Sequence, residues 1–289
     1  KDPDKNELKA GEGFPARWSQ KVEKLLQAPG DGGRYALTIL TFNVGWFFFI
    51  DPTWTKKWLL SAFERGGQDR DAAFAGVFWS ARIPQRQIFG FLKPHILSIA
   101  KAGSDDARRE RDAVAGFLLA GWGADESPQI SDEEMNEVLL SGSEELRLSV
   151  LRNLERWAKT EPAWLQRVPH FIGEVWPRQI EIRTPKISLA LSDLAFECQE
   201  ILSELTPLLM PLLSRAEGEY VHLYDLADAG GPAETKPEDT LALLHAVLPS
   251  QIALWPYRIE QVLEMLVSKK PELRTDSRLV DLRRRWGGL

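Results

Sequence analysis

The sequence predicts an all-α protein, arranged as a solenoid of helix pairs. The first observation behind this prediction is a stretch that the chain contains twice. Residues 70–79 read RDAAFAGVFW, and residues 111–119 read RDAVAGFLL. The two copies lie about 41 residues apart, and a looser third copy at 145–157 follows about 36 residues later, a period typical of stacked helix pairs.

The second observation is the spacing of the apolar residues. Residues 107–122 place four apolar side chains on one helix face: Val114, Phe117, Leu118 and Trp122. No segment alternates between apolar and polar residues for long enough to build a sheet. Residues 179–183 come nearest, and they are too few. Both observations favour helices throughout.

The first half of the chain is predicted to form a series of helices. They span residues 16–27, 34–49, 53–65, 70–82, 84–100 (with a kink near Pro94) and 107–122. A loop at 29–33, with the sequence PGDGG, separates the first two. The helix at 34–49 is almost entirely apolar. Because a helix that is apolar on all sides is usually enclosed by neighbours, we expect it to be buried.

Helix-start signals organise the middle of the chain. Capping boxes at 131–134 and 141–144 each predict a helix start, and a helix over 162–175 is expected to pair with the second of these helices. Thr184-Pro185 predicts the start of a long helix, and Thr206-Pro207 the start of the next. The buried stripe of the long helix is Ile187, Leu191, Leu194, Cys198, Ile201 and Leu205.

The C-terminal part begins with a break in the helical pattern. Residues 218–239 are predicted to form a long loop or irregular insert, and helices at 237–248, 256–269 and 276–286 follow. Three arginines, Arg283, Arg284 and Arg285, suit the C-terminus of the last helix and a polar cap on the stack. The predicted divisions are therefore residues 1–33 (polar segment and first helix), 34–217 (repeat stack) and 218–289 (insert and cap).

The repeated stretch itself has two features with structural interpretations. Gly76 and Gly116 take corresponding places in the two copies. Glycine inside a helix is unfavourable by about 1 kcal/mol relative to alanine, so its repetition predicts a close approach between helix backbones. Asp71 and Asp112 are interpreted as first-turn residues that favour the helix dipole.

Composition and charge narrow the class of protein. The chain has 289 residues, 44% of them hydrophobic, and a net charge of −6, which argues against broad nucleic-acid or anionic-membrane binding. Its one cysteine, Cys198, excludes an intramolecular disulfide and is expected to be buried and inert. The longest apolar run, 35–50, is short for a bilayer span. We therefore expect no membrane association and a cytoplasmic location.

Catalytic motifs are missing from the sequence. It contains no HExxH, no GxSxG and no dinucleotide-binding or kinase-like glycine pattern. The four histidines, His95, His170, His222 and His245, do not have metal-ligand spacing. We predict no enzyme activity, no metal site and no cofactor.

Two groups of residues are candidates for contact with a partner. The first is the set of cations in the middle of the chain: Arg82, Arg86, Lys93, Arg108 and Arg109. In a helical-repeat stack they could line a concave face and meet a phosphate-bearing partner, although a solvated helix face is the simpler interpretation. The second is a polar, aromatic group in the insert, where His222 and Tyr224 stand near Tyr220 and Asp225.

The helix-pair pattern resembles HEAT-like repeats. The C-terminal passages PEDTLALL at 237–244, LWPY at 254–257 and LRTD at 273–276 are similar to the helical domains that follow sirtuin-like, NAD-hydrolysing domains in bacterial anti-phage defence proteins. The similarity covers residues 35–289. It implies that NAD cleavage would belong to another domain and that this chain is a sensing or assembly module. Because the chain starts at a lysine, we expect it to be part of a larger protein.

Three functions are consistent with the sequence. The first is a non-catalytic scaffold for recognition of a protein, or for self-association, since solenoids present long surfaces to large partners. The second is nucleic-acid binding by the central cations, which the net charge disfavours. The third is small-molecule binding near His222. The repeat pattern and the missing catalytic motifs favour the first.

Overall fold

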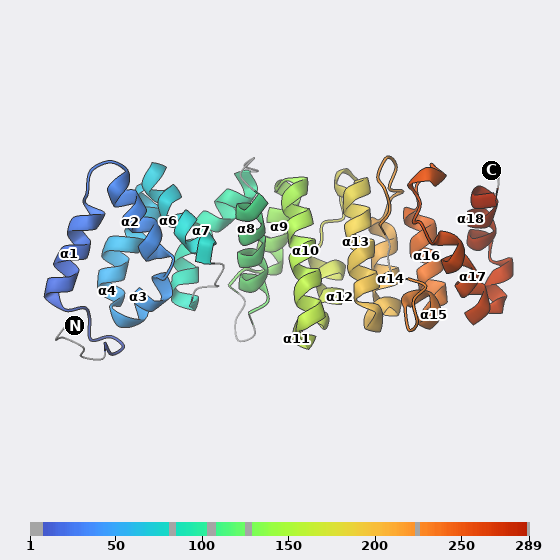
Figure 1. The fold of residues 1–289 in the computed structure, drawn as a ribbon, viewed down its shortest axis with the longest axis horizontal. Coiled ribbons are helices and arrows are strands. Elements are labelled where there is room, and N and C mark those ends of the chain that lie inside the picture. The colour runs from blue at the N-terminus through green and yellow to red at the C-terminus, as the bar shows by residue number, and fades with distance from the viewer. Residues whose placement is uncertain (1–7, 81–84, 103–107, 125–128, 223–225, 288–289) are drawn as a thin grey trace. The chain divides into compact units, whose positions relative to one another are not determined.

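The computed structural model describes residues 8–80, 85–102, 108–124, 129–222 and 226–287, with the backbone alone for residues 108–110. The described residues form helices and no β-strand, so the predicted all-α class is confirmed. They fall into two compact units, Lys1–Ile130 (unit 1) and Ser131–Leu289 (unit 2). Figure 1 colours unit 1 from blue into green and unit 2 from green to red.

Unit 1 consists of helices joined by short connections. They are α1 (Ala16–Leu26), α2 (Asp31–Thr41), α3 (Val44–Ile50), α4 (Pro52–Thr55), a π-helical turn (Lys56–Leu60), α5 (Ser61–Arg65), α6 (Gly67–Ser80), α7 (Arg86–Ala102) and α8 (Arg108–Trp122). The repeated stretch therefore forms α6 and α8, as predicted. The four apolar residues predicted for one face of α8 are all buried.

Unit 2 has longer helices separated by short 3-10 and π-helical turns. The longer elements are α9 (Asp132–Ser141), α10 (Glu144–Thr160), α13 (Pro185–Glu197), α14 (Leu202–Leu209), α16 (Pro237–Val247), α17 (Ile259–Lys269) and α18 (Ser277–Gly287). The shorter ones are α11 (Pro162–Leu165), α12 (Val168–His170), a π turn (Phe171–Val175), α15 (Pro232–Thr235) and 3-10 turns at Ile180–Ile182, Gln199–Ile201, Met210–Leu212, Ile252–Leu254 and Pro271–Thr275.

The prediction of one enclosed apolar helix over 34–49 is wrong in two respects. The chain forms two helices here, α2 and α3, with a break at Phe42 and Asn43, where Asn43 has a non-helical backbone. The segment is also not enclosed, since Tyr35 and Ile39 on α2 are largely exposed. The helix starts earlier than predicted as well, because Asp31 occupies its first turn and pairs with Arg34.

Several helix boundaries in unit 2 differ from the prediction. The capping box at Ser131 is confirmed. The next helix is capped by Ser143 and not by the predicted residue at position 141, because the Ser143 hydroxyl accepts from the Leu146 amide. The long helix begins at Thr184 as predicted, yet it ends at Cys198. Thr206-Pro207 lies inside α14, because the Thr206 hydroxyl donates to the Leu202 carbonyl and does not cap a helix start.

The helix over 162–175 is divided into α11, α12 and a π turn, with prolines at the starts of both short helices. The predicted insert at 218–239 contains α15, and residues 218–222 and 226–231 before it are not helical.

Asp71 and Asp112 are not first-turn residues, because α6 begins at Gly67 and α8 at Arg108. Asp71 instead pairs with its neighbour Arg70 at the surface.

Helices α2 and α6 pack against each other unusually closely. The Thr38 hydroxyl on α2 donates to the Ala72 carbonyl on α6 (2.9 Å), and the Arg34 side chain donates to the Gln68 side chain. The second bond joins residues four positions earlier on each helix, so the two helices run parallel. A Cβ atom on Gly76 would lie 2.2 Å from the Thr38 carbonyl oxygen. The close approach predicted from the glycine in the first copy is therefore confirmed at Gly76.

The C-terminal arginines do more than cap a helix end. The Arg285 guanidinium donates to the carbonyls of Leu248 and Pro249 and lies 4.8 Å from the centre of the Trp255 ring. Trp255 donates its indole N–H to the Pro249 carbonyl (2.7 Å). Arg284, by contrast, is exposed and pairs with Asp281. Arg285 therefore fixes α18 to the segment that follows α16.

Replacing Arg285 by lysine is expected to lower the free energy of unfolding by about 1–3 kcal/mol, because lysine lacks the planar guanidinium that lies over the Trp255 ring while it donates to the two carbonyls. Arg284→Lys is the matched control and should change stability by less than about 0.5 kcal/mol, since it alters an exposed pair. Urea unfolding followed by tryptophan fluorescence measures both. Equal effects of the two substitutions would contradict the role assigned to Arg285.

Candidate functional site

The structure describes the side chains of two of the five predicted cations. Arg86 and Lys93 lie seven residues apart on α7, which places them on one face of that helix; Arg86 is exposed and Lys93 is half-buried. Arg82 lies outside the described residues. Arg108 and Arg109 belong to the first turn of α8, where the structure describes the backbone alone. The described residues therefore do not test the predicted basic surface.

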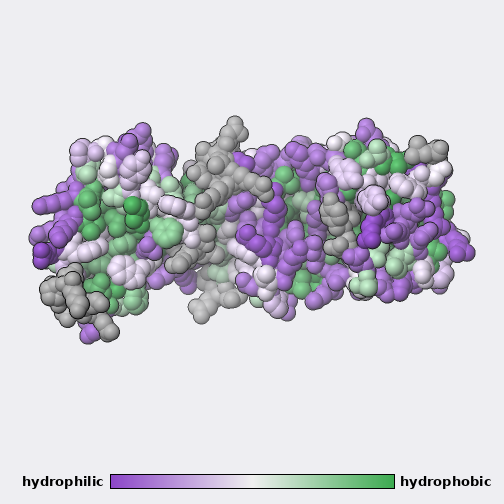
Figure 2. All heavy atoms as spheres, viewed as in Figure 1, coloured by the Kyte–Doolittle hydropathy of each residue, from purple (hydrophilic) through white to green (hydrophobic). Residues whose placement is uncertain are grey.

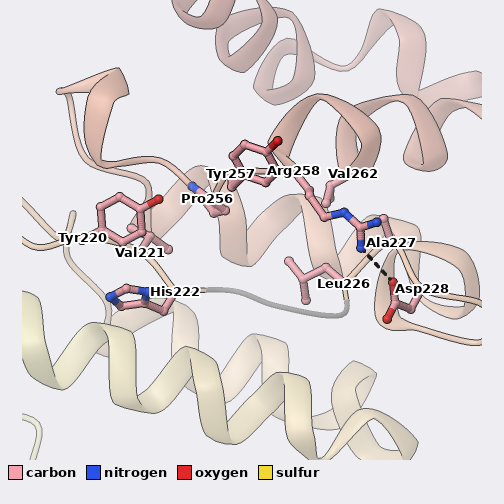
Figure 3. A pocket seen from close by; sticks show the side chains of 10 residues that line it. All are labelled: Tyr220, Val221, His222, Leu226, Ala227, Asp228, Pro256, Tyr257, Arg258 and Val262. Carbon is pink, nitrogen blue, oxygen red and sulfur yellow. Dashed lines mark hydrogen bonds and ion pairs between the residues drawn. The ribbon is translucent and has the colours of Figure 1, made fainter.

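The second predicted group, around His222, forms part of a pocket in unit 2. The rings of Tyr220 and His222 lie 4.6 Å apart, while Tyr224 and Asp225 lie outside the described residues. The amide of Val221 donates to the Leu254 carbonyl (2.9 Å), which holds this loop against the segment before α17. The other wall comes from that segment and from α17 itself, as Figure 3 shows.

The pocket has an aromatic side and a charged side. Tyr257 projects from the segment before α17 and is the most exposed of the large apolar residues, at 91%. On the other side, Arg258 and Asp228 form an ion pair at 3.3 Å (Figure 3). The pocket encloses ≈ 140 Å³. Sites for small molecules and cofactors usually enclose about 300–1,000 Å³, so this pocket is of a size to take one side chain.

Five large apolar side chains on α2, α3 and α6 of unit 1 are exposed, and this exposure was not predicted. We call this surface the aromatic face, and it consists of Tyr35, Ile39, Trp46, Phe49 and Trp79, which are between 47% and 68% exposed. Figure 2 shows hydrophobic residues in green on the visible side of unit 1, beside paler residues of intermediate hydropathy. Single exposed apolar residues are ordinary, but several on adjoining elements mark a surface for contact with a partner.

The aromatic face rests on a packed layer of helices. Tyr35 and Ile39 are one turn apart on α2, and Trp79 lies on α6, which packs along α2. The ring of Phe42 bridges the two helices by meeting Trp79 edge to face at 6.0 Å. Trp46 contacts the buried ring of Phe47 at 4.9 Å. These contacts hold the exposed side chains in place before any partner binds, which lowers the entropy lost on binding.

The charges beside the aromatic face are balanced within the chain. Asp31 pairs with Arg34 on α2, and Arg70 pairs with Asp71 on α6. Each pair joins opposite charges on the same helix, so neither adds a net charge to the border of the face.

A cluster of ionisable groups lies where α10 packs along α13 in unit 2. The Lys159 ammonium bridges Glu197 (2.8 Å) and Glu155 (3.3 Å). Burial, together with the charges of those two glutamates, raises the pKa of Asp193 to about 7, although Lys159 acts in the opposite direction. Cys198 is buried, as predicted, and burial raises the pKa of its thiol to about 12, which favours the protonated form.

The remaining histidines take part in local packing. His95 stands among the rings of Phe63, Phe74 and Phe91 at 6.2–6.5 Å. His170 contacts Asp132 at 2.9 Å, and His245 lies 3.6 Å from Asp281. Across the described ranges, no cluster of three or more histidine, cysteine or acidic side chains has a geometry that could hold a metal ion.

Comparisons of the chain with protein families, with curated proteins and with solved structures find no significant match. None of the helices in the described part of the chain combines the length and the apolar character that crossing a bilayer requires.

Proposed function

We propose that this chain is a non-catalytic helical-repeat module that recognises a protein through the aromatic face of unit 1. The observation that carries the proposal is the set of large apolar side chains held exposed on the α2–α6 layer. Tryptophan and tyrosine contribute most to binding energy at protein interfaces, and three of the five residues of the face are of these types.

The repeat character of the module is supported by its side-chain hydrogen bonds. In unit 1, Arg34 and Thr38 bond to groups 34 residues later in the chain. In unit 2 the corresponding separations are 38 for Asp132 with His170, 40 for Glu144 with Thr184, and 36 for Ser203 with Asp239. A recurring separation of this size is expected when each helix packs beside its counterpart in the next helix pair, as in HEAT-like repeats.

The two other functions have less support. Nucleic-acid binding needs clustered cations, and the net charge of −6 disfavours it. Small-molecule binding would use the pocket beside His222, whose volume suits a single side chain of a protein partner better than a free ligand. That pocket is therefore more consistent with a second contact point for a protein.

We place the module in a larger bacterial defence protein on the basis of the C-terminal passages at 237–244, 254–257 and 273–276. In that arrangement the chemistry, such as NAD cleavage, belongs to a separate domain in the cytoplasm. This module would sense a trigger or assemble the protein. Its lack of catalytic motifs and its exposed aromatic face both suit that role.

A photo-crosslinking amino acid at position 35, in place of Tyr35, is expected to form adducts with a protein when the chain is expressed in its native cell and irradiated. Tyr35 is exposed on the aromatic face, so a bound partner would lie within reach of its side chain. The matched control carries the same amino acid at Ile180, which is 72% exposed on unit 2. Gel electrophoresis and mass spectrometry identify the adducts. No adduct at position 35, or equal adducts at both positions, would contradict the proposed function.

A further inference from the structure

We infer that the occupant of the aromatic face is a second copy of this chain, so that two copies pair through their α2–α6 layers. The inference rests on the proposed function and names its partner. Three properties of the face carry it: its area, its charge and the distribution of the other exposed apolar residues.

The area of the face is close to what a small dimer interface needs. With the exposed fractions given above, its five side chains present about 500 Å² of apolar surface, taking 150–250 Å² for a whole aromatic side chain. Two such faces would bury about 1,000 Å² together, which reaches the area expected of a biological interface and lies in the range of weak, transient ones. A reversible dimer of moderate affinity follows.

The charge of the face permits pairing with itself. A two-fold interface brings identical residues close to one another, and a face with net charge would therefore repel its copy. The ion pairs on its border, Asp31 with Arg34 and Arg70 with Asp71, are each neutral. Two copies can consequently meet without an uncompensated charge between them.

The other exposed apolar residues that the structure describes do not form a second surface that could receive the aromatic face of another copy. In unit 2, Leu140, Ile180, Met210 and Val280 lie on four separate elements, and Tyr220 and Tyr257 line the small pocket. In unit 1, Leu8 lies before α1 and Leu25 lies near its end. A head-to-tail contact would need a second apolar surface to receive the first. Among the described residues the best match in size for the aromatic face is another aromatic face, which makes the contact two-fold and closed.

Sedimentation and light scattering of the purified full chain test the inference. We expect the mass to rise from 32.7 kDa toward twice that value with concentration. Ile39→Glu should weaken the association more than ~30-fold, because each copy would place a carboxylate in an apolar contact. The matched control Ile180→Glu, on an equally exposed isoleucine of unit 2, should leave it unchanged. Tyr35→Ser, with Tyr257→Ser as its control, repeats the comparison without adding a charge.

Circular dichroism must give the same helix content and melting temperature for each pair of variants, so that a change in mass reports association. A wild-type chain that stays monomeric at every concentration, or a dimer that Ile39→Glu and Tyr35→Ser leave intact, overturns the inference. If the chain is monomeric while position 35 still crosslinks to a different protein, the proposed function stands and the second copy is excluded as the partner.

Discussion

Replacing Gly76 by alanine is expected to destabilise the helix layer of unit 1 by at least about 2–3 kcal/mol, the size of effect produced by overpacking a core. The added methyl group would lie 2.1 Å from the Thr41 hydroxyl oxygen and 2.2 Å from the Thr38 carbonyl oxygen. The second of these is backbone, so α2 and α6 would have to move apart. Urea unfolding and amide hydrogen exchange of the two helices measure the effect.

Gly90→Ala is the matched control, because Gly90 also lies within a helix but has open space where a Cβ would be. It should raise the free energy of unfolding by about 0.5–1 kcal/mol, the ordinary gain of alanine over glycine in a helix. The two substitutions therefore have opposite expected signs. If both stabilised the protein, the close approach of α2 and α6 would be wrong.

Gly76→Ala is also expected to affect the aromatic face. Tyr35, Ile39 and Trp79 are placed by the packing of α2 along α6, and Gly76 sets the distance between those helices. Gly76→Ala should consequently weaken binding at the aromatic face even where the protein remains folded. The crosslink at position 35 is the readout.

Local sequence signals predicted the parts of the fold that depend on neighbouring residues. The capping box at Ser131, the Thr184-Pro185 helix start and the buried face of α8 are all determined within a few residues, and all are confirmed. Gly76 was identified because an interior glycine is unfavourable unless something packs against it. These signals need no knowledge of the tertiary arrangement.

The aromatic face could not be found in this way. Apolar residues surround the helix at 34–49 on all sides, and such a pattern does not distinguish a helix enclosed by its own chain from one that leaves a face for a partner. Tyr35 and Ile39 are separated by one turn, on the side away from the buried Leu37. The signal was present in their spacing, but the choice between core and contact surface depends on which helices lie nearby.

The pocket and the ionisable cluster depend on contacts that are distant in sequence. His222 and Tyr220 were recognisable as a polar, aromatic group, whereas Tyr257 and Arg258 reach it from the segment before α17. The burial of Asp193 could not be predicted, because the residues next to an aspartate in an apolar helix do not show whether another helix covers it. Its environment arises only when α10 brings Glu155 and Lys159 against α13.

Asp193→Asn is expected to stabilise the protein at neutral and alkaline pH and to leave it nearly unchanged in acid. The folded state keeps the Asp193 carboxyl protonated up to about pH 7, whereas an ordinary aspartic acid loses its proton near 3.8. Between these values the folded state holds one more proton than the unfolded state, so the free energy of unfolding falls as pH rises. The stability contributed by this protonation is complete below about pH 4 and lost above about pH 7.

The full effect is at most about 4 kcal/mol, and we expect about 1–3 kcal/mol because the asparagine amide also needs hydrogen-bond partners. Urea unfolding at a series of pH values gives the difference in free energy of unfolding between variant and wild type, which should grow from about pH 4 to about pH 7 and then level off. Asp71→Asn is the control, since Asp71 is exposed and pairs with Arg70. Parallel curves for Asp193→Asn and the wild type would show that Asp193 is already ionised in the folded protein.

A second substitution separates the effect of burial from that of charge. Lys159 lowers the pKa of Asp193, while Glu155 and Glu197 raise it. Replacing Lys159 by methionine keeps most of the aliphatic chain and removes the one nearby cation, so the pKa of Asp193 should rise further. The fall in stability should then extend to higher pH at the same limiting slope, because only one proton is involved. Asp193→Asn in the same background should remove this extension. If Lys159→Met left the pH dependence unchanged, the Lys159 charge would have no part in setting the protonation of Asp193.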